Sequence, residues 1–386
     1  MLSYFFDKNK KLYHLFSKYQ FIDKNNIKYN WKNIYDFLVK KYKWNIEKIN
    51  EAYNKLDIFF NKYKIQTKIF NFIYWKLNDK EYIEKLFKEF FHENKEFTPR
   101  WQIKYWNLIR FLNLENILKI WIEWSTSQYN FFNELLKWNI LHRVFILFNN
   151  FNKENTEKWA LKDTYTFIRT QLKRWSILNP YFISTILNKY KWKNLLSLVH
   201  SWQSYQLWFY KSFYINYFCN DIVSLWDNIK NLDIYIKRKF SNIYSISEKN
   251  IFETNFDFTS KEIIWYYINK NIDTVIVCPP YYNLEHYDNS SWLQSWEKSY
   301  DEYLNDMKTM INNWIKITNK YFILIIANYW KYKLFDIFLN YIKNCFSKLW
   351  KIKEIVLTNK KANINNFESL NDKYNWWEFC IIFEKE

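Results

Sequence analysis

The chain contains no glycine and 22 tryptophans among its 386 residues. Average usage would place roughly 27 glycines in a chain of this length. Glycine is the residue that most readily adopts positive φ, ends helices and lets a ligand approach the backbone. A fold built from this sequence must therefore use residues with side chains at every such position.

Tryptophan stands where turns are expected, as at Trp330, Trp350 and the pair Trp376–Trp377. We therefore hypothesise that many of the tryptophans correspond to UGA codons that the native translation machinery reads as glycine. The alternative is a genuinely tryptophan-rich chain with aromatic stripes in its core. The codons themselves, above all the one at position 202, distinguish the two interpretations.

The composition, with 49% hydrophobic and 25% charged residues, excludes a disordered tail protein. The most apolar run, Tyr321–Ala327, is far shorter than a membrane span, and the first residues do not have the pattern of a secretory signal. The four cysteines are widely scattered, without a Cys-x-x-Cys pair, which indicates a reducing compartment and neither a disulfide framework nor a metal site. We expect a cytoplasmic protein with no membrane partner.

Basic residues outnumber acidic ones by 57 to 39, which gives a net charge of +18. A charge of this size suits a polyanionic partner, most often a nucleic acid. The alternative is the codon bias of an A/T-rich gene, which would also fill the chain with Lys, Asn and Ile.

The pattern of apolar residues changes at about residue 176. Residues 1–175 are predicted to form a helical domain, because apolar residues recur three and four positions apart. Lysines and aromatics interleave there, as suits contacts with nucleic-acid backbone and bases, although an amphipathic bundle with solvated lysines fits equally well. In residues 176–386, short apolar strands alternate with helices, which predicts an α/β domain with a parallel sheet. The predicted strands are Asn194–Val199, Ile215–Cys219, Asn242–Ser247, Thr274–Cys278, Tyr321–Ala327, Ile352–Thr358 and Phe379–Glu384.

The most specific segment is Asp273–Glu285, an apolar strand that runs into two prolines, two tyrosines and Asn-Leu-Glu. Pro279 and Pro280 stiffen the strand exit and leave backbone carbonyls outside the sheet ladder. The Pro279 carbonyl can accept a hydrogen bond from an exocyclic amine, and Tyr281 can offer a flat face to a base turned out of its stack. In open α/β sheets, ligands bind beyond the carboxyl ends of the strands, which is where this run is expected.

This run resembles the motif of the DNA amino-methyltransferases, in which Asp, Asn or Ser precedes Pro-Pro and an aromatic residue. That family uses S-adenosylmethionine to methylate N6 of adenine or N4 of cytosine. The resemblance covers about residues 176–386 and implies a Rossmann-like, seven-stranded methyltransferase domain behind the all-α N-terminal domain. It implies that the catalytic residues are Cys278, Pro279, Pro280 and Tyr281, and that Tyr282 and Asn283 contact the substrate base.

Cys278 departs from the family pattern, because a thiol is a weaker hydrogen-bond acceptor than Asp, Asn or Ser. Its size is nearest to that of Ser, which is common among the N4-cytosine enzymes. The target base therefore stays open between adenine and cytosine.

The resemblance also implies a cofactor site upstream, at the turn after the strand that begins at Asn194. With glycine at Trp202 and Trp208, this turn is similar to the family's first motif, in which glycine lets the methionine moiety approach the backbone. The family's usual Asp at the strand end is missing, and Ser197 and His200 stand near its place. The implied cofactor-binding residues of this turn are Ser197, His200, Ser201 and Trp202.

Two more residues complete the expected cofactor site. Asp221 ends the next strand, where an acid can bind both ribose hydroxyls; the alternative is a helix N-cap. Asn179 precedes Pro180 and resembles the segment that closes the methionine side of the family's pocket, although a plain helix start at Pro180 fits as well.

These features predict a site-specific DNA methyltransferase whose helical half, or a partner protein, recognises the target. One alternative is an RNA base methyltransferase of the same fold. Another is a catalytically inert nucleic-acid-binding module, in which a true tryptophan at 202 fills the methionine site. The sequence leaves open whether a restriction–modification partner exists.

Overall fold

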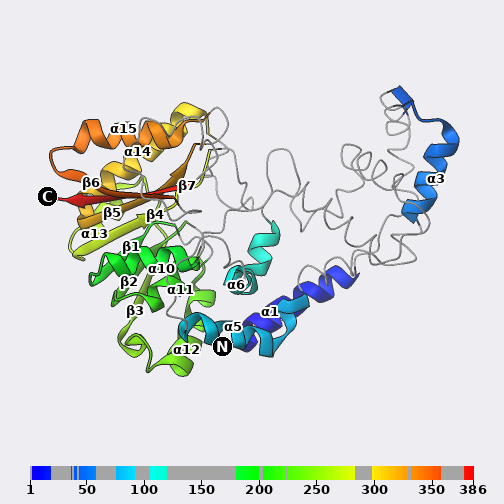
Figure 1. Cartoon of the computed structure of the whole chain (residues 1–386), viewed down its shortest axis with the longest axis horizontal. Helices are drawn as coiled ribbons and strands as arrows, with labels where there is room; N and C mark the ends of the chain where they lie inside the picture. Colours follow the sequence, from blue (N-terminus) through cyan, green and yellow to red (C-terminus); the bar gives the residue numbers. More distant parts are fainter. Residues whose placement is uncertain are drawn as a thin grey trace.

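The computed structural model shows a sheet flanked by helices, with further helices from the N-terminal half packed against one side (Figure 1). It describes residues 2–18, 36, 39–40, 43–57, 75–92, 105–119, 180–199, 203–222, 224–282, 298–328, 332–357 and 378–386. The expected helices between residues 120 and 179 lie outside these described residues.

The seven-stranded sheet has the order β3-β2-β1-β4-β5-β7-β6. Its strands are β1 (Asn194–Ser197), β2 (Asn216–Asn220), β3 (Asn250–Thr254), β4 (Ile272–Val277), β5 (Thr318–Ala327), β6 (Trp350–Leu357) and β7 (Glu378–Lys385). Strands β1 to β5 are mutually parallel, whereas β7 runs antiparallel to β5 and β6. This confirms the predicted Rossmann-like fold with its seven-stranded sheet.

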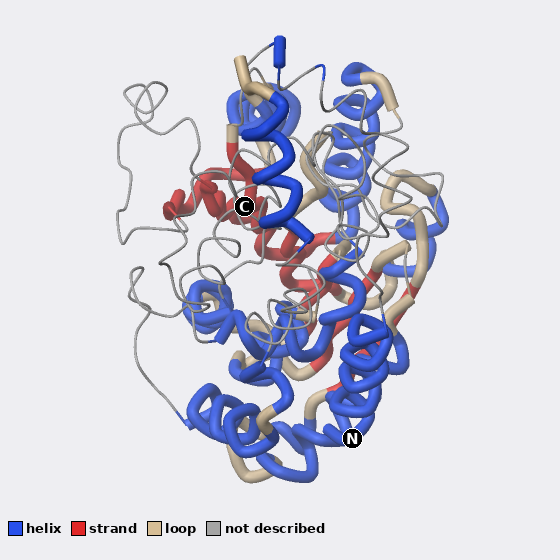
Figure 2. The backbone as a smooth tube through the Cα atoms, turned by 90° about the vertical axis from the view of Figure 1, so that its right-hand side faces the viewer, coloured by secondary structure: helices blue, strands red, loops and turns tan. Residues whose placement is uncertain are grey.

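Both faces of the sheet are covered by helices, as Figure 2 shows. The helices of this half are α10 (Pro180–Lys189), α11 (Ser204–Lys211), α12 (Trp226–Phe240), α13 (Lys261–Tyr267), α14 (Tyr300–Ile317) and α15 (Leu334–Phe346). Side chains alternate across a strand, so neighbouring residues enter different cores. Leu195 of β1 belongs to the core that includes α10, α11 and α12, and Leu196 belongs to the core that includes α13, α14 and α15.

The described N-terminal elements are all helical. They are α1 (Leu2–Lys18), α3 (Ile46–Asp57), the 3-10 turn η2 (Trp75–Asn78), α5 (Lys80–His92) and α6 (Trp106–Lys119). No helix within the described residues combines the length and the apolarity needed to span a bilayer.

Helices α1, α5 and α6 pack against α11 and α12 in one continuous hydrophobic core. Phe87 of α5 lies 5.1 Å from Tyr235 of α12, measured between ring centroids. Asn228 of α12 accepts a hydrogen bond from the Tyr4 hydroxyl (3.1 Å) and donates one to the Leu112 carbonyl (3.2 Å). The sheet therefore has a second helical layer outside the first on this face.

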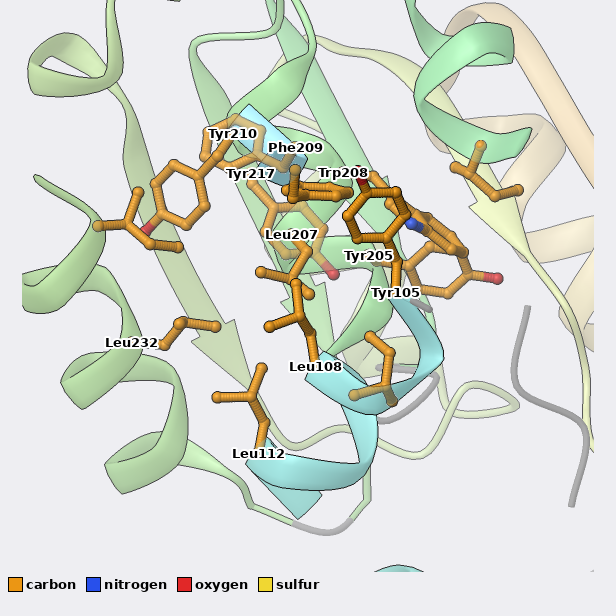
Figure 3. Packing of buried hydrophobic residues seen from close by; sticks show 14 of the residues in the cluster. Tyr105, Leu108, Leu112, Tyr205, Leu207, Trp208, Phe209, Tyr210, Tyr217 and Leu232 are labelled. Carbon is orange, nitrogen blue, oxygen red and sulfur yellow. The ribbon is translucent and has the colours of Figure 1, made fainter. Parts of the chain in front are cut away.

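Helix α11 lies between these layers, and all eight of its residues are buried. Figure 3 shows Leu108 and Leu112 of α6 packed beside Leu207 of α11 and Leu232 of α12. A helix that is buried on every side has no polar face to give to solvent. Half of its residues are aromatic, and its polar residues Ser204, Gln206 and Lys211 are buried as well.

The strand predicted over Asn242–Ser247 is wrong. Its alternating apolar residues suggested a strand, but Tyr244 and Ser245 have φ of 52° and 50°, which is incompatible with extended backbone. A turn and the 3-10 helix η4 (Ile246–Glu248) occupy this segment, and the sheet strand follows as β3.

The backbone shows how the described part of the chain manages without glycine. Its left-handed positions are Lys43, Gln203, Tyr244, Ser245 and Asn271, and no described tryptophan lies at one. Three buried tryptophans, at 208, 314 and 350, leave the indole N–H without a hydrogen-bond partner. Such an unpaired buried donor carries a free-energy cost of about 1–3 kcal/mol.

Candidate functional site

The candidate site lies at the carboxyl edge of the sheet, between the adjacent parallel strands β1 and β4. After β1 the chain continues into α11 on one face, and after β4 it continues toward α14 on the other face. Open α/β sheets bind ligands at such a point, where the chain direction switches. The two predicted motifs follow β1 and β4 and therefore flank this point.

The proline run begins directly after β4. Cys278 and Pro280 are half-buried and Pro279 is buried, while Tyr281 is 7% exposed and belongs to the core formed with α14 and α15. The Tyr303 hydroxyl of α14 donates a hydrogen bond to the Pro280 carbonyl oxygen, 2.9 Å away. The run is thus held at the strand exit by both its ring packing and its backbone.

A cluster of four tyrosines lies beside the run, and the sequence analysis did not single out three of them. Tyr282 lies 5.2 Å from Tyr300, 5.4 Å from Tyr303 and 5.1 Å from Tyr332, between ring centroids. Tyr282, Tyr300 and Tyr332 are half-buried, so each exposes part of its ring. Tyr300 and Tyr303 are three residues apart on α14, and this spacing, visible in the sequence, puts both rings on one face of the helix.

Glu378, the first residue of β7, is a second functional candidate that sequence reasoning missed. It pairs with Ala327 at the end of β5, and because β7 is antiparallel, its first residue lies at the carboxyl edge. The Tyr281 hydroxyl donates to Glu378 Oε1 at 3.3 Å. Burial raises the pKa of Tyr281 well above its usual value, and the carboxylate of Glu378 raises it further.

On the other side of the switch point, Asp221 follows β2 and is half-buried. Its backbone is fixed by hydrogen bonds from Asp221 N to the Thr254 carbonyl (3.1 Å) and from the Asn255 side chain to the Asp221 carbonyl (2.8 Å). Helix α12 does not use Asp221 as its cap, because the Leu225 N–H donates to Glu253 instead (2.8 Å). Strands β2 and β4 are two positions apart in the sheet, or about 10 Å.

Ser197, the last residue of β1, is fully buried. Its hydroxyl lies 2.6 Å from the hydroxyl of Tyr217 on β2, so the two side chains share a hydrogen bond inside the core. The hydroxyl of Ser197 therefore bonds within the protein, beneath the edge of the sheet.

Unpaired polar atoms gather where α11 begins. Gln203 has φ of 59° and is fully buried; its amide nitrogen donates to Gln206 at 3.1 Å, and its Oε1 has no partner. The Tyr205 hydroxyl is also fully buried and unpaired. A buried acceptor and a buried hydroxyl beside a strand-to-helix loop fit a ligand with polar groups, which would satisfy them.

Five of the predicted site residues lie outside the described residues: Asn179, His200, Ser201, Trp202 and Asn283. The structure brings Cys278, Pro279, Pro280, Tyr281 and Tyr282 together at one strand end. Asp221 and Ser197 lie at the ends of the two strands on the other side of the switch point.

No family model and no curated protein matches the sequence. Among solved structures, the chain is similar to an rRNA methylase from Streptococcus thermophilus. That similarity has a TM-score of 0.31 and 10% sequence identity, and it covers 53% of this chain and 93% of the methylase. The function of this chain must therefore be inferred from its own residues.

Proposed function

We propose that the chain is an S-adenosylmethionine-dependent methyltransferase that acts on an exocyclic amine of DNA, N6 of adenine or N4 of cytosine. The observation that supports this best is the exit of Cys278-Pro279-Pro280-Tyr281 from β4 at the switch point of the sheet. The proline run can orient an amine, and Asp221 can bind ribose hydroxyls. Both lie at the carboxyl edge of the sheet.

The cofactor supplies the electrophilic methyl group. Asp221 binds the ribose hydroxyls, since an acid at the end of the second strand of a Rossmann-like unit is suited to that role. Gln203 Oε1 and the Tyr205 hydroxyl, both buried and unpaired, bind polar groups of the methionine moiety. Asn179, Ser197, His200, Ser201 and Trp202 keep the cofactor roles that the resemblance implies for them.

The substrate base turns out of its stack and enters the site from the side of the tyrosine cluster. Tyr281 forms the floor, and the half-exposed ring of Tyr282 contacts the base together with Asn283. Cys278 and the Pro279 carbonyl orient the amine. Positioning of the amine against the methyl group supplies most of the rate, because a held pair of reactants has a high effective concentration.

Basic groups of residues 1–175 hold the phosphates in this proposal. The net charge of +18 supports a polyanionic partner. Binding should weaken steeply with salt, because each neutralised phosphate releases counterions.

The experiment measures S-adenosylmethionine binding by calorimetry and methyl transfer to duplex DNA and to structured RNA. We expect cofactor binding and transfer to DNA, with transfer lost in Tyr281→Ala but kept in the control Tyr266→Ala, a partly exposed tyrosine of α13. Methyl transfer to RNA but not to DNA would show that the substrate is RNA. A chain that binds nucleic acid but no cofactor would contradict the proposal and indicate an inert binding module.

A further inference from the structure

The candidate site has a strong hydrogen-bond acceptor that the proline run itself lacks. Cys278 stands where an amine-binding motif needs an acceptor, and a thiol accepts hydrogen bonds only weakly. Glu378 brings a carboxylate to the same edge from β7, and it contacts the run through the Tyr281 hydroxyl, 3.3 Å away. A carboxylate has two oxygens and can accept several hydrogen bonds at once, which a thiol cannot.

The residues around Glu378 form one group with the proline run. Glu378 and Cys278 both raise the pKa of Tyr281 and of Tyr205, after burial, which has the largest effect. Glu378 and Cys278 therefore both lie within electrostatic reach of Tyr281 and of Tyr205. The Tyr205 hydroxyl, fully buried and unpaired, supplies one more polar atom to this group.

We infer that the carboxylate of Glu378 is the acceptor that binds the exocyclic amine of the target base, in place of the acceptor missing at position 278. This inference rests on the proposed function. The amine nitrogen donates its electron pair to the methyl carbon, and the bond between that carbon and sulfur breaks with its electron pair left on sulfur. The methylated nitrogen, now cationic, releases one proton to the Glu378 carboxylate.

A carboxylate in this place also selects the class of base. Adenine and cytosine present an amino group as a donor on the edge that reacts, whereas thymine presents carbonyl oxygens at the corresponding positions. A carboxylate attracts the amino donor and repels a carbonyl oxygen. The inferred acceptor therefore favours the binding of adenine and cytosine over thymine, independently of methyl transfer.

The chain offers a matched control on the same strand. Glu384, near the other end of β7, accepts a hydrogen bond from Tyr321 at 2.9 Å, just as Glu378 accepts one from Tyr281. Glu384→Gln therefore changes a second Tyr–Glu pair, in which the Glu also binds Lys353 (2.8 Å), at the edge of the sheet that faces away from the site. Tyr281→Phe removes the hydroxyl that holds Glu378 but keeps the carboxylate.

The test compares Glu378→Ala, Glu378→Gln, Tyr281→Phe and Glu384→Gln by methyl transfer and by the affinity for short homopolymers of dA, dC and dT. We expect the wild type and Glu384→Gln to bind dA or dC about tenfold or more tightly than dT, since a hydrogen bond to a charged group discriminates by that order. Glu378→Ala loses this preference and lowers transfer at saturating cofactor at least tenfold. Glu378→Gln, which keeps the shape of the side chain, retains the fold by circular dichroism but loses the preference for amino-bearing bases.

The two ideas fail in different ways. Equal base preference in the wild type and in both Glu378 variants would overturn the role of Glu378, whether or not any methyl transfer is seen. A wild type that binds the homopolymers but transfers no methyl group to any nucleic acid would contradict the proposed function instead. Unchanged cofactor affinity in the Glu378 variants is expected, because Glu378 is inferred to bind the base.

Discussion

The hydroxyl of Tyr303 on α14 donates a hydrogen bond to the carbonyl oxygen of Pro280, 2.9 Å away. This bond ties the helix that follows the candidate site to the peptide between the second proline and Tyr281. Helix α14 begins at Tyr300, and a capping box formed by Ser299 and Glu302 fixes this start. The direction of the Tyr281 ring is therefore set from two sides, by its own core and by α14.

Tyr303→Phe should lower methyl transfer about tenfold while leaving cofactor affinity unchanged. The variant loses one hydrogen bond, a net contribution of about 0.5–1.5 kcal/mol, and frees the peptide that aims Tyr281. Single-turnover transfer and calorimetric titration of the cofactor measure the two effects. Tyr341→Phe is the control, because its hydroxyl makes a bond of the same length to Asn312, away from the site. Equal transfer in both variants would contradict the positioning role.

Asp221→Asn should weaken binding of S-adenosylmethionine by about tenfold or more, because the charged acceptor for the ribose hydroxyls becomes a neutral one. Calorimetry measures the change directly. Asp301→Asn, at an exposed position in the first turn of α14, is the matched control and should bind the cofactor as the wild type does. An affinity that is the same in wild type and Asp221→Asn would remove Asp221 from the cofactor site.

Lys249 gives the stability a distinctive pH dependence. Its ammonium is buried and donates to the carbonyl oxygens of Ser212 and Tyr214, and burial lowers its pKa to about 7. In the unfolded chain the pKa is near its usual 10.5. Between these values the unfolded chain binds more protons at this residue than the folded chain, so the free energy of unfolding should rise with pH.

Urea unfolding at pH 7, 8 and 9 tests this expectation. The upper limit of the Lys249 contribution is about 1.4 kcal/mol per pH unit. Lys249→Met should flatten the rise, since it has no titrating group there. If the variant and the wild type show the same slope, Lys249 is charged in the folded protein throughout this range.

Leu108→Ala should destabilise the sheet as well as the N-terminal helices. Leu108 is fully buried between α6 and α11, and the truncation costs about 2–5 kcal/mol when a cavity remains. Hydrogen exchange should therefore speed up in α11 and β1 as well as in α6. Ile46→Ala, 58% exposed on α3, is the control and should leave exchange unchanged. Acceleration confined to α6 would show that the two layers unfold independently.

The intact mass of the protein from its native host tests the codon hypothesis. Each position read as glycine removes an indole side chain, so the mass falls well below that of the printed sequence. The unpaired indole N–H groups of Trp208, Trp314 and Trp350 favour glycine at these three positions. The left-handed backbone positions give the hypothesis no support, because none of them is a described tryptophan. A mass equal to that of the printed sequence would end the hypothesis.

Most of the sheet could be predicted because its strands are short apolar runs with polar ends. Ile272–Val277 is such a run, and the two prolines after it mark the end of the strand. The segment around Tyr244 has the same alternation, but its backbone is left-handed at Tyr244 and Ser245, which a pattern of apolar residues does not reveal. The predicted strand Phe379–Glu384 corresponds to β7, but it leaves out Glu378, the residue that this strand brings to the site.

Glu378 was missed for that reason. It lies 97 positions from Tyr281 in the sequence, and only the antiparallel course of β7 brings the two together. Ser197 was located at a strand end from the sequence, but the hydrogen bond between its hydroxyl and that of Tyr217 on the next strand could not be foreseen. Sequence position identifies the edge of the sheet, but the direction of each side chain depends on the pleat and the neighbouring strands.

The complete burial of α11 has a consequence for how the two halves of the chain work together. The helix begins directly after Gln203 and includes Tyr205, and it packs against the sheet and the N-terminal helices. A helix enclosed in this way cannot shift unless both neighbouring layers shift with it. If binding of a polyanion moves the N-terminal helices, the atoms at the start of α11 move with them. The affinity for the polyanion and the affinity for a ligand bound at the start of α11 then become reciprocally linked.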